Sequence, residues 1–203
     1  RDKHILNGKF IHCKIFIQSL LKNDRKKILN KNIRNFPHIY VYKSINGYNE
    51  TEVISEYNRI GLKYTNLDFK TYGTLANFLT KVKILEYQIE ENISHICLVE
   101  DDILLKKSFF KYINKQLWHF NNKINLLRLG KWGEMYIIDI KGANNILNRI
   151  KTTGIIKNID NQLRENCGSE LYLSGAKDHY YLKCGTNDGY CLRTSKINKL
   201  KLI

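Results

Sequence analysis

The sequence has little proline and no long apolar run. Of its 203 residues, one is proline and twelve are glycine, so neither a long flexible linker nor a repeat array is expected. No apolar stretch approaches the roughly 20 residues that cross a bilayer, and no secretory signal pattern is present. Because 43% of the residues are hydrophobic, the chain is expected to fold as one globular domain with a sizeable core.

The cysteines are few, and their spacing suggests no pairs. The five cysteines are an odd number and form no C-x-x-C pair, which argues against a disulfide framework or a zinc site. Cys13 and Cys97 lie in apolar runs and are expected to be buried thiols. A reducing compartment, the cytoplasm, is therefore expected.

The chain has far fewer acidic residues than basic ones. The chain has 34 lysines and arginines against 19 aspartates and glutamates, which gives a net charge of +15. Such a balance attracts polyanions, which include nucleic acid, anionic membranes and phosphorylated small molecules. The lysines are scattered along the chain, so charge alone does not identify the partner.

Three consecutive carboxylates, Glu100, Asp101 and Asp102, follow the apolar run 96–99. That run is typical of a buried strand, and ligands bind at the carboxyl ends of strands in open α/β sheets. Carboxylates are costly to bury unless cations or hydrogen-bond donors meet them. The motif therefore indicates a site for a hard cation that carries phosphate oxygens. The alternative is a solvated acidic turn that caps a helix starting near Lys106.

Apolar periodicity predicts strands that alternate with helices. The predicted strands are residues 13–19, 38–42, 96–99, 124–129 and 135–138. The predicted helices are residues 23–33, 50–60, 72–89, 107–120, 142–150 and 159–166. Residues 170–193 are expected to form short strands and loops that close over a site. Alternation in the first half predicts a parallel sheet, and the less regular second half predicts a mixed one.

Several short motifs occur in a characteristic order. They are Asn23-Asp24-Arg25 at a helix start, Ile45-Asn46-Gly47 after a strand, Gly73-Thr74 opening a long helix, Glu100-Asp101-Asp102, Leu127-Arg128-Leu129-Gly130, Tyr136-Ile137-Ile138 with Lys141-Gly142-Ala143, and Ile159-Asp160. From residue 15 to residue 160, this succession resembles the family 25 glycosyltransferases, which include lipooligosaccharide sugar transferases and collagen galactosyltransferases. The sequence departs from the family at Gln18-Ser19-Leu20 and at Ala76-Asn77. The richness in Asn, Ile, Lys and Tyr suits a large DNA virus, for which the compartment would be the host cytoplasm.

The resemblance implies an α/β chain with a single GT-A (Rossmann-like) domain, whose central sheet is mixed, mainly parallel and flanked by helices. Residues 13–105 would form the nucleotide-sugar-binding half and residues 106–203 the acceptor-side half, after a leader or expression remnant at 1–12. It also implies a nucleotide-sugar donor, expected to be a UDP-sugar, a glycan or glycoprotein acceptor, and Mn²⁺ or Mg²⁺. No specific nucleic acid and no transmembrane segment are expected.

The resemblance also suggests individual roles. Glu100 would lie near the donor ribose with Asp101 close by, and Asp102 would bind the metal. Asp160 would be the general base of an inverting displacement, although an N-cap explains it equally well. His179 would be a late metal ligand, unless it only packs beside its neighbouring tyrosines.

Other candidates come from position and residue type. Arg25 has a guanidinium that suits phosphate oxygens, or it is simply a solvated helix residue. Lys83, on the polar side of the long helix, is expected to approach the donor. Small residues at strand ends or a helix start would let a base and ribose approach the backbone, although turn formation also explains them: Ser19, Asn46, Gly47 and Thr74. Trp132 and Tyr136 would stack on an acceptor sugar, or pack in the core.

Two other functions are compatible with the residues. A metal-dependent phosphodiesterase or nuclease would use the three carboxylates for hydrolysis, but it should show further clustered ligands. A non-catalytic polyanion-binding module would depend mainly on the net charge, and its binding would be strongly salt-dependent.

Overall fold

The chain folds around a central sheet of six strands, in the order β4-β3-β5-β8-β7-β9. The computed structural model describes residues 4–6, 9–11, 13–36, 39–61, 71–121, 123–129, 134–155, 159–173 and 181–183. The strands of the sheet are β3 (Cys13–Ser19), β4 (Ile39–Lys43), β5 (His95–Glu100), β7 (Leu126–Arg128), β8 (Met135–Asp139) and β9 (Glu170–Tyr172). Strands β3, β4 and β5 are parallel, β8 is antiparallel to β5 and to β7, and β9 is parallel to β7. The expected α/β class with a mixed, mainly parallel sheet is confirmed.

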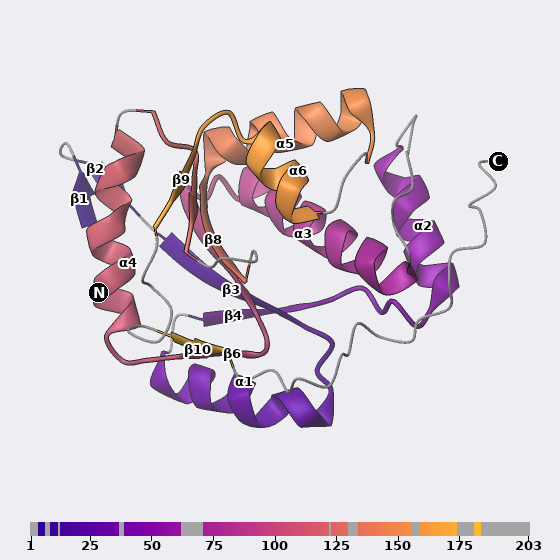
Figure 1. Ribbon diagram of the computed structural model, residues 1–203, viewed down its shortest axis with the longest axis horizontal. Coiled ribbons are helices and arrows are strands. Elements are labelled where there is room, and N and C mark those ends of the chain that lie inside the picture. Colours follow the sequence, from indigo (N-terminus) through magenta and orange to yellow (C-terminus); the bar gives the residue numbers. More distant parts are fainter. Residues whose placement is uncertain are drawn as a thin grey trace.

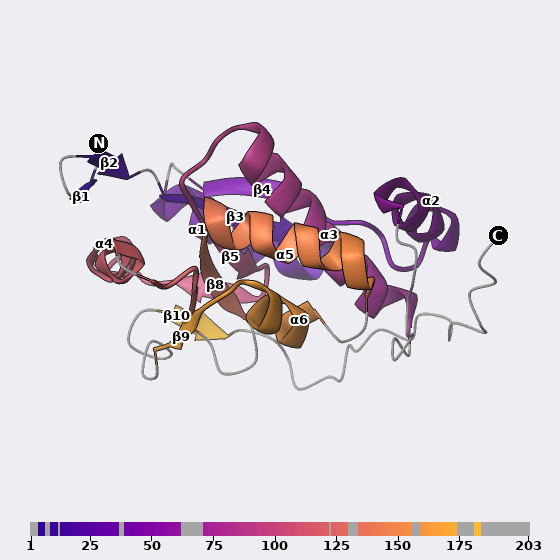
Figure 2. The same cartoon turned by 90° about the horizontal axis from the view of Figure 1, so that it is seen from above.

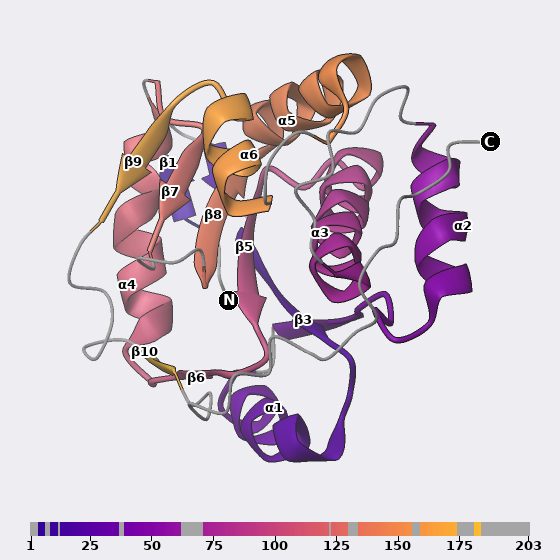
Figure 3. The same ribbon diagram turned by 45° about the vertical axis from the view of Figure 1, so that its right-hand side comes forward.

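Helices cover both faces of this sheet (Figure 1). They are α1 (Asn23–Asn35), α2 (Glu50–Ile60), α3 (Tyr72–Glu90), α4 (Phe109–Gln116), α5 (Ile140–Thr153) and α6 (Ile159–Asn166), and the 3-10 turn η1 (Leu117–Asn121) follows α4. Helices α3, α5 and α6 lie on one face, with α3 and α5 side by side, and α1 and α4 lie on the other (Figures 2 and 3). Among the described residues, no helix combines the length and apolar character needed to cross a membrane.

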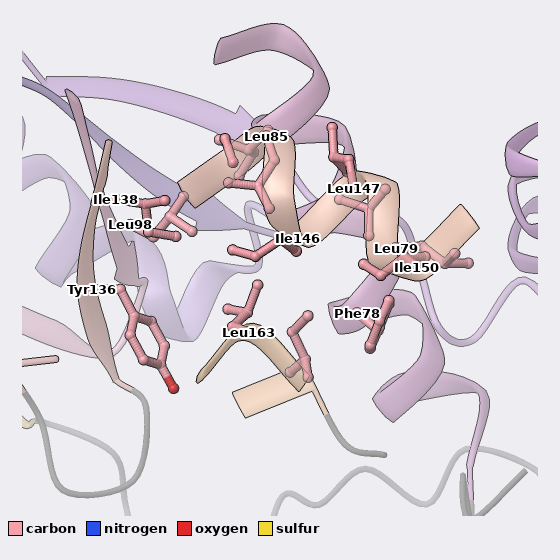
Figure 4. Packing of buried hydrophobic residues seen from close by; sticks show 14 of the residues in the cluster. Phe78, Leu79, Leu85, Leu98, Tyr136, Ile138, Ile146, Leu147, Ile150 and Leu163 are labelled. Atoms are coloured by element: carbon pink, nitrogen blue, oxygen red, sulfur yellow. The ribbon is translucent and has the colours of Figure 1, made fainter. Parts of the chain in front are cut away.

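Strand alternation divides the core into two clusters. On one face Leu98, Tyr136 and Ile138 pack against α3, α5 and α6 (Figure 4). Phe16 belongs to the same cluster. On the other, residues such as Ile17 pack against α1 and α4. Successive side chains of a strand point to opposite faces of the sheet. At the ends of β3 and β5, neighbouring polar side chains therefore face different helices.

Helix α3 is buried on almost all sides. The predicted apolar face of α3 is indeed inside, but Lys81, Thr80 and Gln88 are buried as well. The reason is that α2 packs on one side of α3 and α5 on the other. A periodicity argument assumes one solvated face, so it does not anticipate a helix enclosed in this way.

Some predicted boundaries differ from the structure. The predicted helix 107–120 ends as an α-helix at Gln116 and tightens into η1. Strand β6 (Ile103–Leu105) was not predicted, and it pairs with β10 (Tyr181–Lys183) outside the central sheet. Strands β1 (His4–Leu6) and β2 (Lys9–Ile11) pair antiparallel with each other, apart from the central sheet.

Asn32, not the apolar Ile33, takes the buried position in the last turns of α1. Its amide donates to the Ile103 carbonyl (2.7 Å) and accepts from the Leu105 amide (2.9 Å), while Ile33 is 41% exposed. These two hydrogen bonds supply partners for backbone groups of strand β6 on the side that faces α1. They therefore hold the segment after the acidic motif against α1.

Candidate functional site

A cavity of about 410 Å³ opens at the carboxyl ends of β3 and β5, beside the start of α3. It is lined by side chains from distant parts of the sequence, namely Gln18, Leu20, Arg25, Ser44, Ile45, Gly47, Thr71, Gly73, Thr74, Ala76, Asn77, Glu100, Asp101, Asp102, Ile159 and Asp160. This is the edge at which open α/β sheets bind ligands. The structure therefore brings the three-carboxylate motif and Asp160 into one cavity.

Each of two carboxylates in the motif meets a donor from another element. Asp101 Oδ2 accepts a hydrogen bond from Ser19 Oγ at 2.7 Å. Asp102 Oδ2 lies 3.6 Å from Arg25 Nη1 of α1. Glu100 is the neighbour of Gln18 across the β3–β5 pair. Because strand β6 separates the motif from α4, the motif does not cap that helix, as the alternative interpretation required.

Ser19 positions Asp101. It is only 1% exposed, and its hydroxyl also accepts a hydrogen bond from the Leu21 amide at 3.0 Å. Leu21 has a φ of 56°, a left-handed conformation that is rare for a bulky residue and needs such support. The hydroxyl thus holds both the turn after β3 and one acidic side chain.

Two glycines let the loop after β4 approach the start of α3. A Cβ atom on Gly47 would lie 2.5 Å from the Gly73 Cα atom, which no real contact allows. The adjacent Thr71 caps α3 by accepting from the Thr74 amide at 3.2 Å. Gly47 and Thr74 are therefore explained first by packing and capping, and both still line the cavity.

Asp160, in the cavity wall, is the centre of a hydrogen-bonded group. Its Oδ1 atom accepts from Tyr136 Oη at 3.1 Å and lies 3.3 Å from Lys81 Nζ. The side chain of Lys81 is 2% exposed and that of Asp160 is 36% exposed. Asp160 lies within the first turn of α6, but its side chain bonds to other elements. A helix-capping role therefore does not account for it.

Tyr136 does not form a stacking platform. Its ring is fully buried within the cluster of apolar side chains that Figure 4 shows, and its hydroxyl donates to Asp160 of α6. Burial raises the pKa of Tyr136 well above its ordinary value, and the charge of Asp160 raises it further. The phenol therefore stays protonated and donates to Asp160 at any physiological pH. Trp132 lies outside the described residues.

Gln18 and Asn77, the two departures from the family pattern, contact each other. Gln18 Nε2 donates to Asn77 Oδ1 at 3.0 Å, and both residues line the cavity. Gln18 is 9% exposed, and its Oε1 atom is buried without a hydrogen bond from the residues that the structure describes. Sequence reasoning missed this pair and Lys81, because polar residues in a strand end and a helix carry no spacing signal of their own.

Of the predicted site residues that the structure describes, Ser19, Asn46 and Lys83 do not line the cavity. Lys83 Nζ contacts Glu56 Oε2 of α2 at 3.1 Å. Asn46 accepts from the Tyr48 amide at 3.1 Å in the turn after β4, next to the lining residues Ile45 and Gly47. His179 lies outside the described residues.

The chemistry of the carboxylate motif fits a hard cation. Its oxygens are the ligands that Mn²⁺ and Mg²⁺ accept, and Asp102 already faces the positive charge of Arg25. Within the described ranges, no group of three or more His, Cys, Asp or Glu side chains is placed to hold a metal ion by itself.

The chain belongs to glycosyltransferase family 25, described as an LPS biosynthesis protein, which it matches over residues 12–200. No curated protein matches the chain. Among solved structures it is similar to a glycosyltransferase involved in the glycosylation of the major capsid of PBCV-1, with 9% identity, a TM-score of 0.39, and coverage of 79% of this chain and 80% of that chain. Family membership identifies the chain as a glycosyltransferase and favours that function over the nuclease and the polyanion-binding module.

The two partners of the Lys81–Asp160 pair should differ in their effect on stability. Asp160→Ala leaves the enclosed ammonium of Lys81 without its carboxylate and should cost about 3 kcal/mol of unfolding free energy. Lys81→Met leaves a carboxylate that water reaches, and should cost only about 1 kcal/mol. The measurement is urea unfolding at neutral pH. The double variant should regain part of the loss caused by Asp160→Ala, whereas equal and additive losses would contradict the pairing.

Proposed function

We propose that this family 25 member transfers a sugar from a UDP-sugar donor to a glycan or glycoprotein acceptor, in a cation-dependent reaction that inverts the anomeric carbon. The observation that supports the proposal is the meeting of Glu100–Asp102 and Asp160 in one cavity. The first group suits a donor diphosphate with its cation, and the second suits a base on the acceptor side. Neither group alone would complete the reaction.

The donor is expected to lie across the carboxyl ends of β3 and β5. Glu100 would accept hydrogen bonds from ribose hydroxyls, and Asp101 supports that edge through Ser19. Arg25, which lines the cavity, offers a planar fork of donors that matches phosphate oxygens. Where Gly47 contacts Gly73, the cavity wall consists of backbone without side chains.

Asp102 would hold Mn²⁺ or Mg²⁺ together with the diphosphate. When bound, such a cation neutralises the charge that develops on the leaving diphosphate. Arg25, 3.6 Å from Asp102, would then turn its guanidinium toward phosphate oxygens. The protein contributes few ligands, as is usual where phosphate and water complete the shell.

Asp160 would act as the base. Its Oδ1 atom is engaged by Tyr136 and Lys81, and its Oδ2 atom receives no hydrogen bond from the residues that the structure describes. Oδ2 would take the proton of an acceptor hydroxyl while the hydroxyl oxygen attacks the anomeric carbon and the bond to the diphosphate oxygen breaks. Attack opposite to the leaving group inverts the configuration.

Lys81 and Tyr136 would position the base. Both bind the same oxygen of Asp160, which would leave the second oxygen for the acceptor. Lys81 Nζ also lies 5.6 Å from the Tyr136 ring centroid, so the three side chains support one another. A carboxylate whose orientation is set before the acceptor arrives loses less entropy in the reaction.

Gln18 would help to select the donor. Its amide nitrogen is bound to Asn77, and its carbonyl oxygen is buried beside the cavity without a donor from the described residues. A buried acceptor without a partner is costly, and an N–H or O–H group of the nucleoside would satisfy it. Uracil offers an imide N–H, whereas cytosine has an acceptor nitrogen at that position, so the geometry favours a UDP donor.

Replacing the base should abolish turnover while the donor still binds. Asp160→Asn keeps an oxygen that can accept from Lys81, so the fold should survive, but kcat for UDP release from UDP-sugars should fall by about 10²–10⁴-fold. Glu165→Gln, on the same helix but outside the cavity wall, is the control and should keep normal kcat. An Asp160→Asn variant with near-normal kcat would exclude Asp160 as the base.

Removing the Gln18 carbonyl should weaken donor binding more than turnover. Gln18→Leu keeps the size of the side chain, and the Kd of UDP measured by calorimetry should rise by about tenfold, the value of one buried hydrogen bond. The Kd of CDP should change little, because cytosine does not donate at that position. Equal losses for both nucleotides would show that Gln18 only shapes the cavity.

A further inference from the structure

The helices on the sheet face opposite to α3 and α5 are strongly basic. From residue 25 to 36 the chain has five lysines and arginines, from 106 to 121 it has four, and neither segment contains an aspartate or glutamate. Helices α1 and α4 and the turn η1 lie in these segments. Part of the net charge of +15 is therefore gathered on one layer of the molecule. Of the basic residues in this layer, the proposed transfer reaction involves only Arg25.

On α4 the cations form a regular stripe. Lys111 and Lys115 are exposed four residues apart on α4, a spacing that places them on one side of the helix. Lys107, exposed in the turn just before α4, precedes Lys111 by another four residues. Trp118 continues the stripe into η1 and is 59% exposed. Like charges at this spacing repel each other, so an anionic partner would stabilise the stripe.

Helix α1 repeats the arrangement. Lys27, Lys31 and Arg34 are exposed at intervals of four and three residues, and Ile33 beside them is 41% exposed. Helix α1, like the segment of α4 and η1, thus presents several cations and one large apolar side chain to solvent.

The two stripes meet where α1 ends and α4 begins. The rings of Phe36 and Phe110 stack there with centroids 6.3 Å apart, and both helices pack on the same core cluster. A shallow hollow of about 460 Å³ lies on α4, lined by Phe110, Lys111, Asn114 and Lys115. It offers two ammonium groups and an amide beside an aromatic ring, which suits an anionic headgroup. Figure 3 shows α1 and α4 on the same side of the sheet.

We propose that this face, formed by α1, α4 and η1, binds a membrane surface that contains anionic lipid. Cations interspersed with exposed tryptophan and aliphatic side chains are the pattern of helices that lie in a membrane interface. The lysine stems would cover apolar surface while their ammonium groups reach lipid phosphates. A nucleic acid backbone would use the cations but would gain nothing from Ile33. Arg25 of α1 lines the cavity, so this face adjoins the site of the proposed reaction.

The test is co-sedimentation of the whole chain with vesicles. Binding to vesicles of phosphatidylcholine with about one-third phosphatidylglycerol should be strong at low salt, weak at high salt, and absent with phosphatidylcholine alone. The triple variant Lys107→Gln, Lys111→Gln and Lys115→Gln should lower the partition coefficient by about a hundredfold, because each lysine near the surface contributes about fivefold. Trp118→Phe should remove most of the blue shift in tryptophan emission on vesicles.

The matched control changes the same charge on the other side of the sheet. Lys141→Gln, Arg149→Gln and Lys151→Gln alter three exposed cations of α5 and should leave vesicle binding nearly unchanged. Equal losses in the two triple variants would overturn the proposal, because they would reflect net charge alone. Binding that favours a single-stranded RNA oligonucleotide over the anionic vesicles would overturn it as well, and would assign the face to nucleic acid.

Discussion

The structure depends on how four carboxylates are accommodated at one edge of a buried sheet. Charged oxygens are tolerated there only where donors or cations meet them. Ser19 meets Asp101, Arg25 meets Asp102, and Lys81 with Tyr136 meets Asp160. These partners come from β3, α1, α3 and β8, so the elements of the fold converge on the cavity through the electrostatic needs of its acidic side chains.

The remaining features keep these partners in place. The glycine contact between residues 47 and 73 brings the loop after β4 against the start of α3. Asn32 ties α1 to strand β6 directly after the acidic motif. Enclosure of α3 between α2 and α5 buries Lys81, and burial limits its ammonium to the one carboxylate it contacts. Side chains held by fixed partners in this way meet a condition for pre-organised catalysis.

Much of the fold was predictable because its signals are local. The alternation of β3 and the periodicity of α2 and α6 follow from side-chain spacing, and the predicted limits of these elements agree with the structure. The role of Ser19 as a support, the position of Lys83 on Glu56 and the pairing of Gln18 with Asn77 were not predictable. They depend on which elements become neighbours in space, and no periodicity within one element carries that information. The roles of Asp102 and His179 toward a metal stay predictions.

The most direct test of the central claim, that the acidic cavity is a cation-assisted nucleotide-sugar site, is a calorimetric titration of UDP into the protein with Mn²⁺ and then with chelator. The account predicts saturable binding with Mn²⁺ that weakens by at least about tenfold in chelator, and an Asp102→Asn variant that no longer distinguishes the two conditions. UDP binding of equal strength with and without Mn²⁺, or binding unaffected by Asp102→Asn, would contradict the claim.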